Sequence, residues 1–135
     1  MSQARPPRIS VLNDNPDFLE LMSAILDEDA GYDVQLFDGK ETGIGELAAS
    51  DPNLIIVDLL LGGASGWEIV TLSRADERLA DVPIIVCSAD VAALRDRAAE
   101  LESVGNVHVL AKPFGIDDIT ALVERLIGRA VPASG

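Results

Sequence analysis

The chain has 135 residues, of which 48% are hydrophobic, so it suits one folded domain and argues against two domains or a disordered chain. Its net charge of −13 at pH 7 disfavours direct contact with nucleic acid or an anionic membrane, and we expect neither as a partner. The first eight residues lack the apolar core of a signal peptide, no apolar run has membrane-spanning length, and Cys87 is the only cysteine. We therefore expect a cytoplasmic protein without an internal disulfide.

Apolar runs of strand length alternate with segments of helical length along the chain. Strands are predicted at about 8–13, 33–37, 54–57, 84–87 and 107–111, the second of them an edge strand. Helices are predicted at about 16–29, 41–49, 67–79, 91–102 and 116–128. This alternation predicts an α/β fold in which helices cover both faces of a parallel sheet. Residues 1–7 are predicted to be a flexible arm, 8–128 the domain and 129–135 a C-terminal tail.

The first predicted helix has a clear beginning and end, and two apolar lines. Asn15 is expected to cap it before Pro16, and Gly31 is expected to end it. The expected core stripe consists of Phe18, Leu21, Met22 and Ile25. Leu19 and Leu26 form a second line, which favours a wide core face, with an exposed patch that binds a partner as the alternative.

Polar or charged residues stand where four of the predicted strands end. They are Asn13 and Asp14, Asp58, Ser88, and Lys112. In an open parallel sheet, ligands bind just beyond the carboxyl ends of the strands. Carboxylates, a hydroxyl and an ammonium suit a divalent cation together with a phosphoryl group.

Four short segments resemble, in order and separation, the motifs of the response-regulator receiver domain. They are Asn13-Asp14-Asn15-Pro16, Asp58-Leu59-Leu60-Leu61-Gly62, Cys87-Ser88-Ala89 and Lys112-Pro113-Phe114. The resemblance covers about residues 8–128. It implies the flavodoxin-like or CheY-like fold, a doubly wound (βα)5 arrangement of five parallel strands in the order 2-1-3-4-5, and a place in two-component phosphorelay signalling.

Asp58 is the residue on which the expected chemistry depends. A carboxylate at the end of an apolar strand is costly unless something there needs it, and an aspartate can attack phosphorus to hold an acyl phosphate. The resemblance implies that Asp58 accepts the phosphoryl group from a sensor histidine kinase or phosphotransfer protein. It also implies that Lys112 binds the carboxylate and then a phosphoryl oxygen, and that the Ser88 hydroxyl donates to the phosphoryl group. The alternative is structural: a cap, a surface lysine and a turn residue.

The resemblance also implies a bound Mg²⁺ ion. Its expected ligands are Asp14, Asp58 and the backbone carbonyl of Leu60. Asn13 stands where the family has the first acid of a pair. We expect it to lie around the metal rather than to bind it directly, and to weaken Mg²⁺ binding. The alternative for Asn13-Asp14 is ordinary turn and capping chemistry.

Two function hypotheses follow. The first is a stand-alone receiver, not a classical enzyme, which catalyses only its own phosphorylation and dephosphorylation. It switches a surface formed by the segments 91–102, 107–111 and 116–128, read by a downstream protein or by a second copy in a homodimer. The second is a degenerate receiver that docks proteins without phosphorylation, favoured by Asn13 and by Val109, which stands where the family often has an aromatic ring. A flavodoxin-like cofactor binder is a third class, disfavoured because no phosphate-cradling loop follows the first strand.

Overall fold

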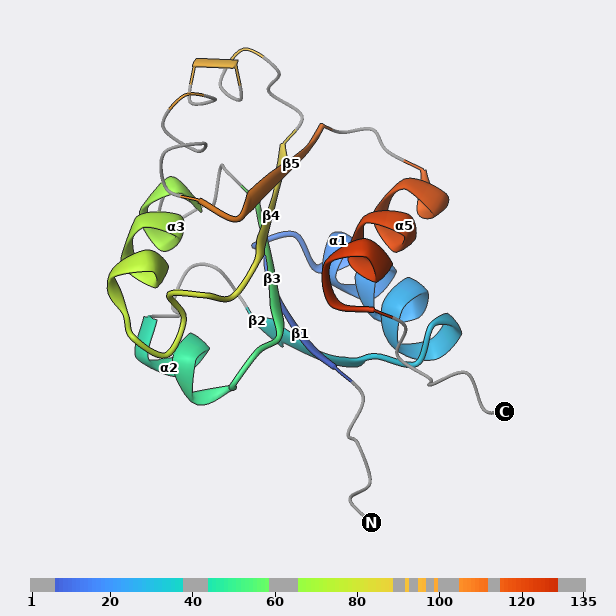
Figure 1. Cartoon of the computed structure of the whole chain (residues 1–135). Coiled ribbons are helices and arrows are strands. Elements are labelled where there is room, and N and C mark those ends of the chain that lie inside the picture. The colour runs from blue at the N-terminus through green and yellow to red at the C-terminus, as the bar shows by residue number, and fades with distance from the viewer. Residues whose placement is uncertain are drawn as a thin grey trace.

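The computed structural model describes residues 7–37, 44–58, 66–88, 105–111 and 115–128, with residues 92, 95, 96 and 99 as separate positions (Figure 1). Several predicted features lie outside these residues. They are most of the arm at 1–7, the loop at 62–65, most of the helix at 91–102, the Lys112-Pro113-Phe114 segment and the tail at 129–135.

The described residues form one sheet of five parallel strands. They are β1 (Arg8–Leu12), β2 (Asp33–Phe37), β3 (Leu54–Asp58), β4 (Ile84–Ser88) and β5 (Val107–Ala111). The spatial order is β2-β1-β3-β4-β5, which confirms the predicted doubly wound fold. Leu12 pairs with Val57, and Asp58 pairs with Cys87, so the carboxyl ends of the three central strands lie at one edge.

Helices cover both faces of the sheet (Figure 1). One face carries α2 (Ile44–Ala49) and α3 (Gly66–Ala75), and the other carries α1 (Pro16–Met22), its π-helical continuation η1 (Ser23–Asp29) and α5 (Ile116–Ile127). The residues of β3 alternate between the two layers: Ile55 packs with the α2–α3 side and Ile56 with the α1–α5 side. Both are fully buried, as expected for a strand covered on both faces.

The first helix begins and ends as predicted. The Asn15 side-chain oxygen accepts a hydrogen bond from the Asp17 backbone N–H at 2.9 Å, which caps α1. At the other end Gly31 has a φ of 85°, and the backbone N–H groups of Gly31 and Tyr32 donate to the carbonyls of Asp27 and Leu26. These bonds reach back four and six residues and close the widened end of the helix, where the left-handed position favours glycine.

The predicted core stripe of this helix is wrong at Leu21, which is 48% exposed. On the second apolar line Leu26 is fully buried and Leu19 packs against the core, so this line belongs to a wide core face. The face that packs on the sheet consists of Phe18, Met22, Ile25 and Leu26, at i, i+4, i+7 and i+8, and Leu21 lies outside it. From Ser23 the helix widens into η1, as the bond from the Ala30 N–H to the Ile25 carbonyl five residues back shows.

The third and fifth helices are shorter than predicted. The third ends at Ala75 rather than 79, because the Asp76 side chain accepts a hydrogen bond from the Arg78 backbone N–H and turns the chain. The fifth ends at Ile127 rather than 128, and its Ile119 and Val123 side chains are fully buried.

Side chains tie the amino end of the sheet to its surroundings. The Arg8 guanidinium donates to Asp33 at 2.9 Å, and the Arg8 backbone N–H donates to the Asn53 side chain at 2.8 Å. The buried Tyr32 donates its hydroxyl to the Gly128 carbonyl at 2.6 Å, which connects the start of β2 to the end of α5. These bonds lie at the edge of the sheet opposite the predicted site.

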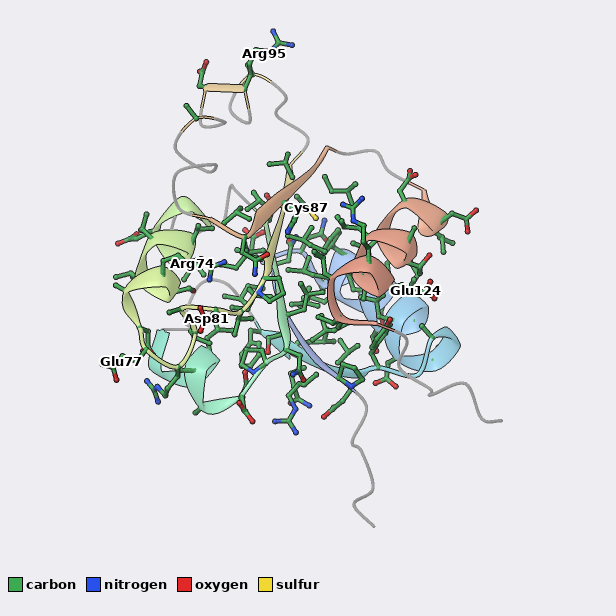
Figure 2. The ribbon with its side chains drawn as sticks, in the orientation of Figure 1. Arg74, Glu77, Asp81, Cys87, Arg95 and Glu124 are labelled. Carbon is green, nitrogen blue, oxygen red and sulfur yellow. The ribbon has the colours of Figure 1, made fainter. Side chains whose placement is uncertain are left out.

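Arg74, near the end of α3, makes a further tie of this kind. Its guanidinium donates to the carbonyls of Leu79, Gly105 and Asn106, each at 3.0 Å, and so joins α3 to the turn before β4 and the start of β5. Figure 2 shows Arg74 and Asp81 on the α3 side of the sheet. Burial lowers the pKa of Arg74, and the Asp81 carboxylate opposes that shift. The guanidinium remains charged, so the three bonds are charge-assisted.

Replacing Arg74 with alanine is expected to lower the free energy of unfolding by about 2–3 kcal/mol, because it leaves three carbonyls without their charged donor. Urea unfolding of the two proteins measures this difference. Arg78→Ala is the matched control, because Arg78 is exposed and pairs with Asp76 at the surface, where ion pairs contribute little. Equal losses in the two variants would contradict the structural role given to Arg74.

Candidate functional site

The strand order brings the predicted site residues to one edge of the sheet. Asn13 and Asp14 follow β1, Asp58 ends β3 and Ser88 ends β4. β5 ends at Ala111, the residue before Lys112. The structure describes the backbone of Ser88 but not its side chain, and Leu60 and Lys112 lie outside the described residues.

The structure places Asn13 directly beside the predicted phosphoacceptor. The Asn13 amide nitrogen donates a hydrogen bond to Asp58 Oδ2 at 3.2 Å. Val11 and Ile56, each two residues earlier on its strand, both pack on the α1–α5 side. Because side chains alternate along a strand, Asn13 and Asp58 continue the same face and meet where it ends.

The orientation of the Asn13 amide is set by its second partner. Asn13 Oδ1 accepts a hydrogen bond from the Asn15 backbone N–H at 2.8 Å. A backbone N–H only donates and an ionised carboxylate only accepts, so the amide oxygen faces Asn15 and the nitrogen faces Asp58. Asn13 is 1% exposed, and its own backbone N–H donates to the Phe37 carbonyl at 3.2 Å.

This contact with Asp58 is the part of the site that the sequence analysis missed. The sequence predicts Asn13 near the metal, where it weakens Mg²⁺ binding, but gives it no role as a hydrogen-bond donor to Asp58. A signal was present: an asparagine two residues before the cap residue Asn15 favours an Asx turn, which uses the amide oxygen and leaves the amide nitrogen for another partner.

The donor chemistry of this edge fits Mg²⁺. Asp14 and Asp58 are both half-buried and come from the ends of adjacent strands. Within the described ranges, no three or more His, Cys, Asp or Glu side chains gather into a metal site. Mg²⁺ is commonly held by only one or two carboxylates, with water and phosphate oxygens completing its shell. The carboxylates of Asp14 and Asp58 therefore match, in type and number, the protein ligands that Mg²⁺ commonly takes.

Cys87 lies opposite Asp58 in the register of β3 and β4. Its side chain is fully buried and packs on the α1–α5 side of the sheet (Figure 2).

A second feature is a groove of about 650 Å³ between β5 and α5. It is lined by Val107, His108, Val109, Leu110, Asp117, Asp118, Ala121, Leu122 and Arg125. Val109 is 43% exposed on this edge strand. His108 lies within hydrogen-bonding distance of the Asn106 side chain, 3.2 Å from His108 Nε2 to Asn106 Oδ1. The groove belongs to the surface that the sequence analysis expects to switch.

Comparison with known proteins places this fold and site in one class. The model of the response regulator receiver domain matches residues 9–124. The chain therefore belongs to this family, which confirms the resemblance. Receiver domains are signalling domains rather than classical enzymes; in two-component systems they accept phosphoryl groups and interact with histidine kinases or phosphotransfer proteins and with downstream targets.

One curated relative is the "DNA-binding dual master transcriptional regulator RpaA" of Synechocystis sp. It is 34% identical over 123 residues, which cover 91% of this chain and 50% of the relative. A second, BaeR of Escherichia coli, is 29% identical over 93% of this chain and 50% of its own length. The chain thus spans about half the length of these two relatives.

Solved receiver structures share the fold. CheY4 of Vibrio cholerae superposes with a TM-score of 0.79 at 20% identity, covering 90% of this chain and 99% of that one. The receiver domain of the sensor histidine kinase PA1611 of Pseudomonas aeruginosa, described with a magnesium ion coordinated in its active-site cleft, superposes with a TM-score of 0.77. It is 27% identical and covers 93% of this chain and 99% of that one.

No helix in the described part of the chain combines the length and apolar character that a membrane span requires.

The groove geometry predicts the titration of His108, the chain's only histidine. Burial lowers the pKa of His108 below its ordinary value, and the Arg125 guanidinium lowers it further. The folded protein therefore gives up this proton at a lower pH than the unfolded chain does. His108 contributes a loss of stability as the pH falls from about 6.5 toward the folded pKa, and none above that range.

An NMR titration of the His108 ring is expected to show a midpoint below about 6.5. In Arg125→Gln the midpoint is expected to rise without reaching the ordinary value, because burial is the larger cause. Arg78→Gln, which removes a charge far from the groove, is expected to leave the midpoint unchanged. A wild-type midpoint at or above about 6.5 would show that the ring is not desolvated in the groove.

Proposed function

We propose that Asp58 accepts a phosphoryl group from the phosphohistidine of a sensor kinase or phosphotransfer protein, in a Mg²⁺-dependent reaction. The observation that carries this proposal is the position of Asp58, half-buried at the end of the central strand β3 and hydrogen-bonded to Asn13. Membership of the receiver family supports it, because accepting a phosphoryl group is the general role of that family.

In the proposed reaction, an Asp58 carboxylate oxygen attacks phosphorus. The bond from phosphorus to the donor imidazole nitrogen breaks, its electron pair returns to that nitrogen, and an acyl phosphate forms on Asp58. Bound Mg²⁺, with Asp14 and Asp58 as its charged ligands, would supply charge neutralisation for the phosphoryl oxygens. The Asn13 amide orients the carboxylate by donating to Oδ2.

The negative charge added at Asp58 would change the conformation of β5. Phosphorylation adds about two negative charges at Asp58, and we infer that Lys112 and the Ser88 hydroxyl neutralise part of them. Ser88 pairs with Ala111 at the end of β5, so a shift at the end of β4 reaches the strand that borders the groove. A downstream protein, or a second copy of this chain, would read the surface formed by residues 91–102, β5 and α5.

Nucleic acid is not a proposed partner of this domain. The net charge of −13 repels a phosphate backbone. The Synechocystis relative is named as DNA-binding, but the matched segment covers only half of that protein, and the name describes the whole of it.

A second candidate function is docking without phosphorylation. Two observations favour it: Asn13 replaces an acid of the family pattern, and the exposed Val109 replaces an aromatic ring that rotates during switching. In this version the groove between β5 and α5 would bind its partner constitutively.

Incubation with acetyl phosphate and Mg²⁺ is expected to label the wild-type protein, and Asp58→Asn is expected to lower labelling at least about 100-fold by removing the nucleophile. Intact-mass spectrometry measures the labelled fraction. Asp81→Asn is the matched control, because Asp81 is an exposed aspartate before the amino end of β4, away from the site. Undiminished labelling of Asp58→Asn would remove the central assignment.

Beryllofluoride with Mg²⁺, which mimics the acyl phosphate, separates the two candidate functions. If the domain switches, backbone amide resonances of β5 and α5 are expected to shift together with those around Asp58. The same addition to Asp58→Asn should leave all of them in place. Shifts confined to the immediate surroundings of Asp58 would instead support the docking module.

A further inference from the structure

The buried Asn13 side chain bridges two groups of opposite hydrogen-bonding character. Its oxygen accepts from the Asn15 backbone N–H at 2.8 Å, and its nitrogen donates to Asp58 Oδ2 at 3.2 Å. The bridge connects the start of α1 to the end of β3. At 1% exposure, Asn13 has little access to water that could take the place of either partner.

An amide is the side chain that these two partners demand. A carboxylate at position 13 could still accept from the Asn15 N–H, but it would turn a second negative oxygen toward Asp58. Two carboxylates that close repel each other unless a cation or a proton lies between them. An asparagine removes that repulsion and adds a donor, so it stabilises the Asp58 carboxylate when no metal ion is bound.

We propose that Asn13 is a positioning residue that holds Asp58 in its reactive orientation without metal and thereby lowers the dependence of the fold on Mg²⁺. This inference rests on the proposed function, in which Asp58 is the nucleophile. The hydrogen bond between Asn13 and Asp58 itself belongs to the unphosphorylated protein. An acid at position 13 would have the opposite effect: it would repel Asp58 when no metal is bound, and Mg²⁺ binding would stabilise the protein more. Asparagine in place of the acid therefore lowers the affinity for Mg²⁺ and raises the stability of the metal-free protein.

The test compares Mg²⁺ binding and thermal unfolding of the wild type with those of Asn13→Asp, with no phosphodonor present. In chelator, Asn13→Asp is expected to unfold at a lower temperature than the wild type. In Mg²⁺ the difference is expected to shrink or reverse, with a Mg²⁺ dissociation constant about tenfold lower than that of the wild type. Titration calorimetry measures the affinity, so the result does not depend on phosphorylation.

Asn15→Asp is the matched control. It adds the same charge two residues away and keeps an oxygen that can cap α1, but the side chain at position 15 serves the Asp17 N–H rather than Asp58. Its Mg²⁺ affinity and melting temperature are expected to stay close to those of the wild type. If Asn15→Asp reproduces the Asn13→Asp effects, general electrostatics explains them and the proposal is wrong.

A double variant keeps the proposal testable if Asn13→Asp fails to fold. Asn13→Asp combined with Asp58→Asn exchanges donor and acceptor across the same pair, with an unchanged net charge. It is expected to recover most of the metal-free stability lost by Asn13→Asp, and to have little response to Mg²⁺. No recovery, or equal Mg²⁺ dependence in the wild type and Asn13→Asp, would overturn the proposal. Failure of phosphotransfer in the wild type would instead remove the proposed function and leave these cation measurements interpretable.

Discussion

The site depends on the pairing of β1 with β3. Because Leu12 lies opposite Val57, the next residues along, Asn13 and Asp58, meet where the two strands end. A shift of one residue in either strand would send one of these side chains to the opposite face of the sheet. The buried runs on both strands fix this register, since Val11 and Ile56 on one layer and Leu12 and Val57 on the other must all be covered. The hydrophobic core thus specifies the geometry of a polar site that it does not contain.

Much of the fold could be predicted from the sequence, because strands buried on both faces produce a strong and simple pattern. Runs such as Leu54–Val57 leave few alternatives, and the sheet order followed from the resemblance. The first helix was harder. Its apolar residues form more than one line, and in the structure Met22, Ile25 and Leu26 are buried whereas Leu21 is exposed. Periodicity detects a helix, but it does not decide which of two neighbouring apolar lines faces the sheet, and it gives no sign of the π-helical turns of η1.

The candidate site was predictable in position and less so in its contacts. Terminal residues of adjacent parallel strands must gather at one edge, so Asp14, Asp58 and Ser88 could be placed there from the sequence. The role of Asn13 could not be read in the same way, because an amide has both a donor and an acceptor. Which end faces Asp58 is decided by the Asn15 N–H, a backbone group whose direction depends on the turn into α1. Substitution of an acid by its amide therefore changes the kind of contact as well as removing a charge.

The ties made by Arg8, Tyr32 and Arg74 give the sheet two ends of different character. These side chains fasten the amino ends of the strands and the loops beside them through charged or buried hydrogen bonds. The carboxyl ends carry the reactive groups on the last paired residues of β3 and β4, Asp58 and Ser88, and on residues just beyond the strands. For protein engineering, this asymmetry separates the residues that stabilise the fold from those that determine specificity. The loops at the reactive edge are the part to exchange between related domains, and Arg8, Tyr32 and Arg74 are the residues to retain.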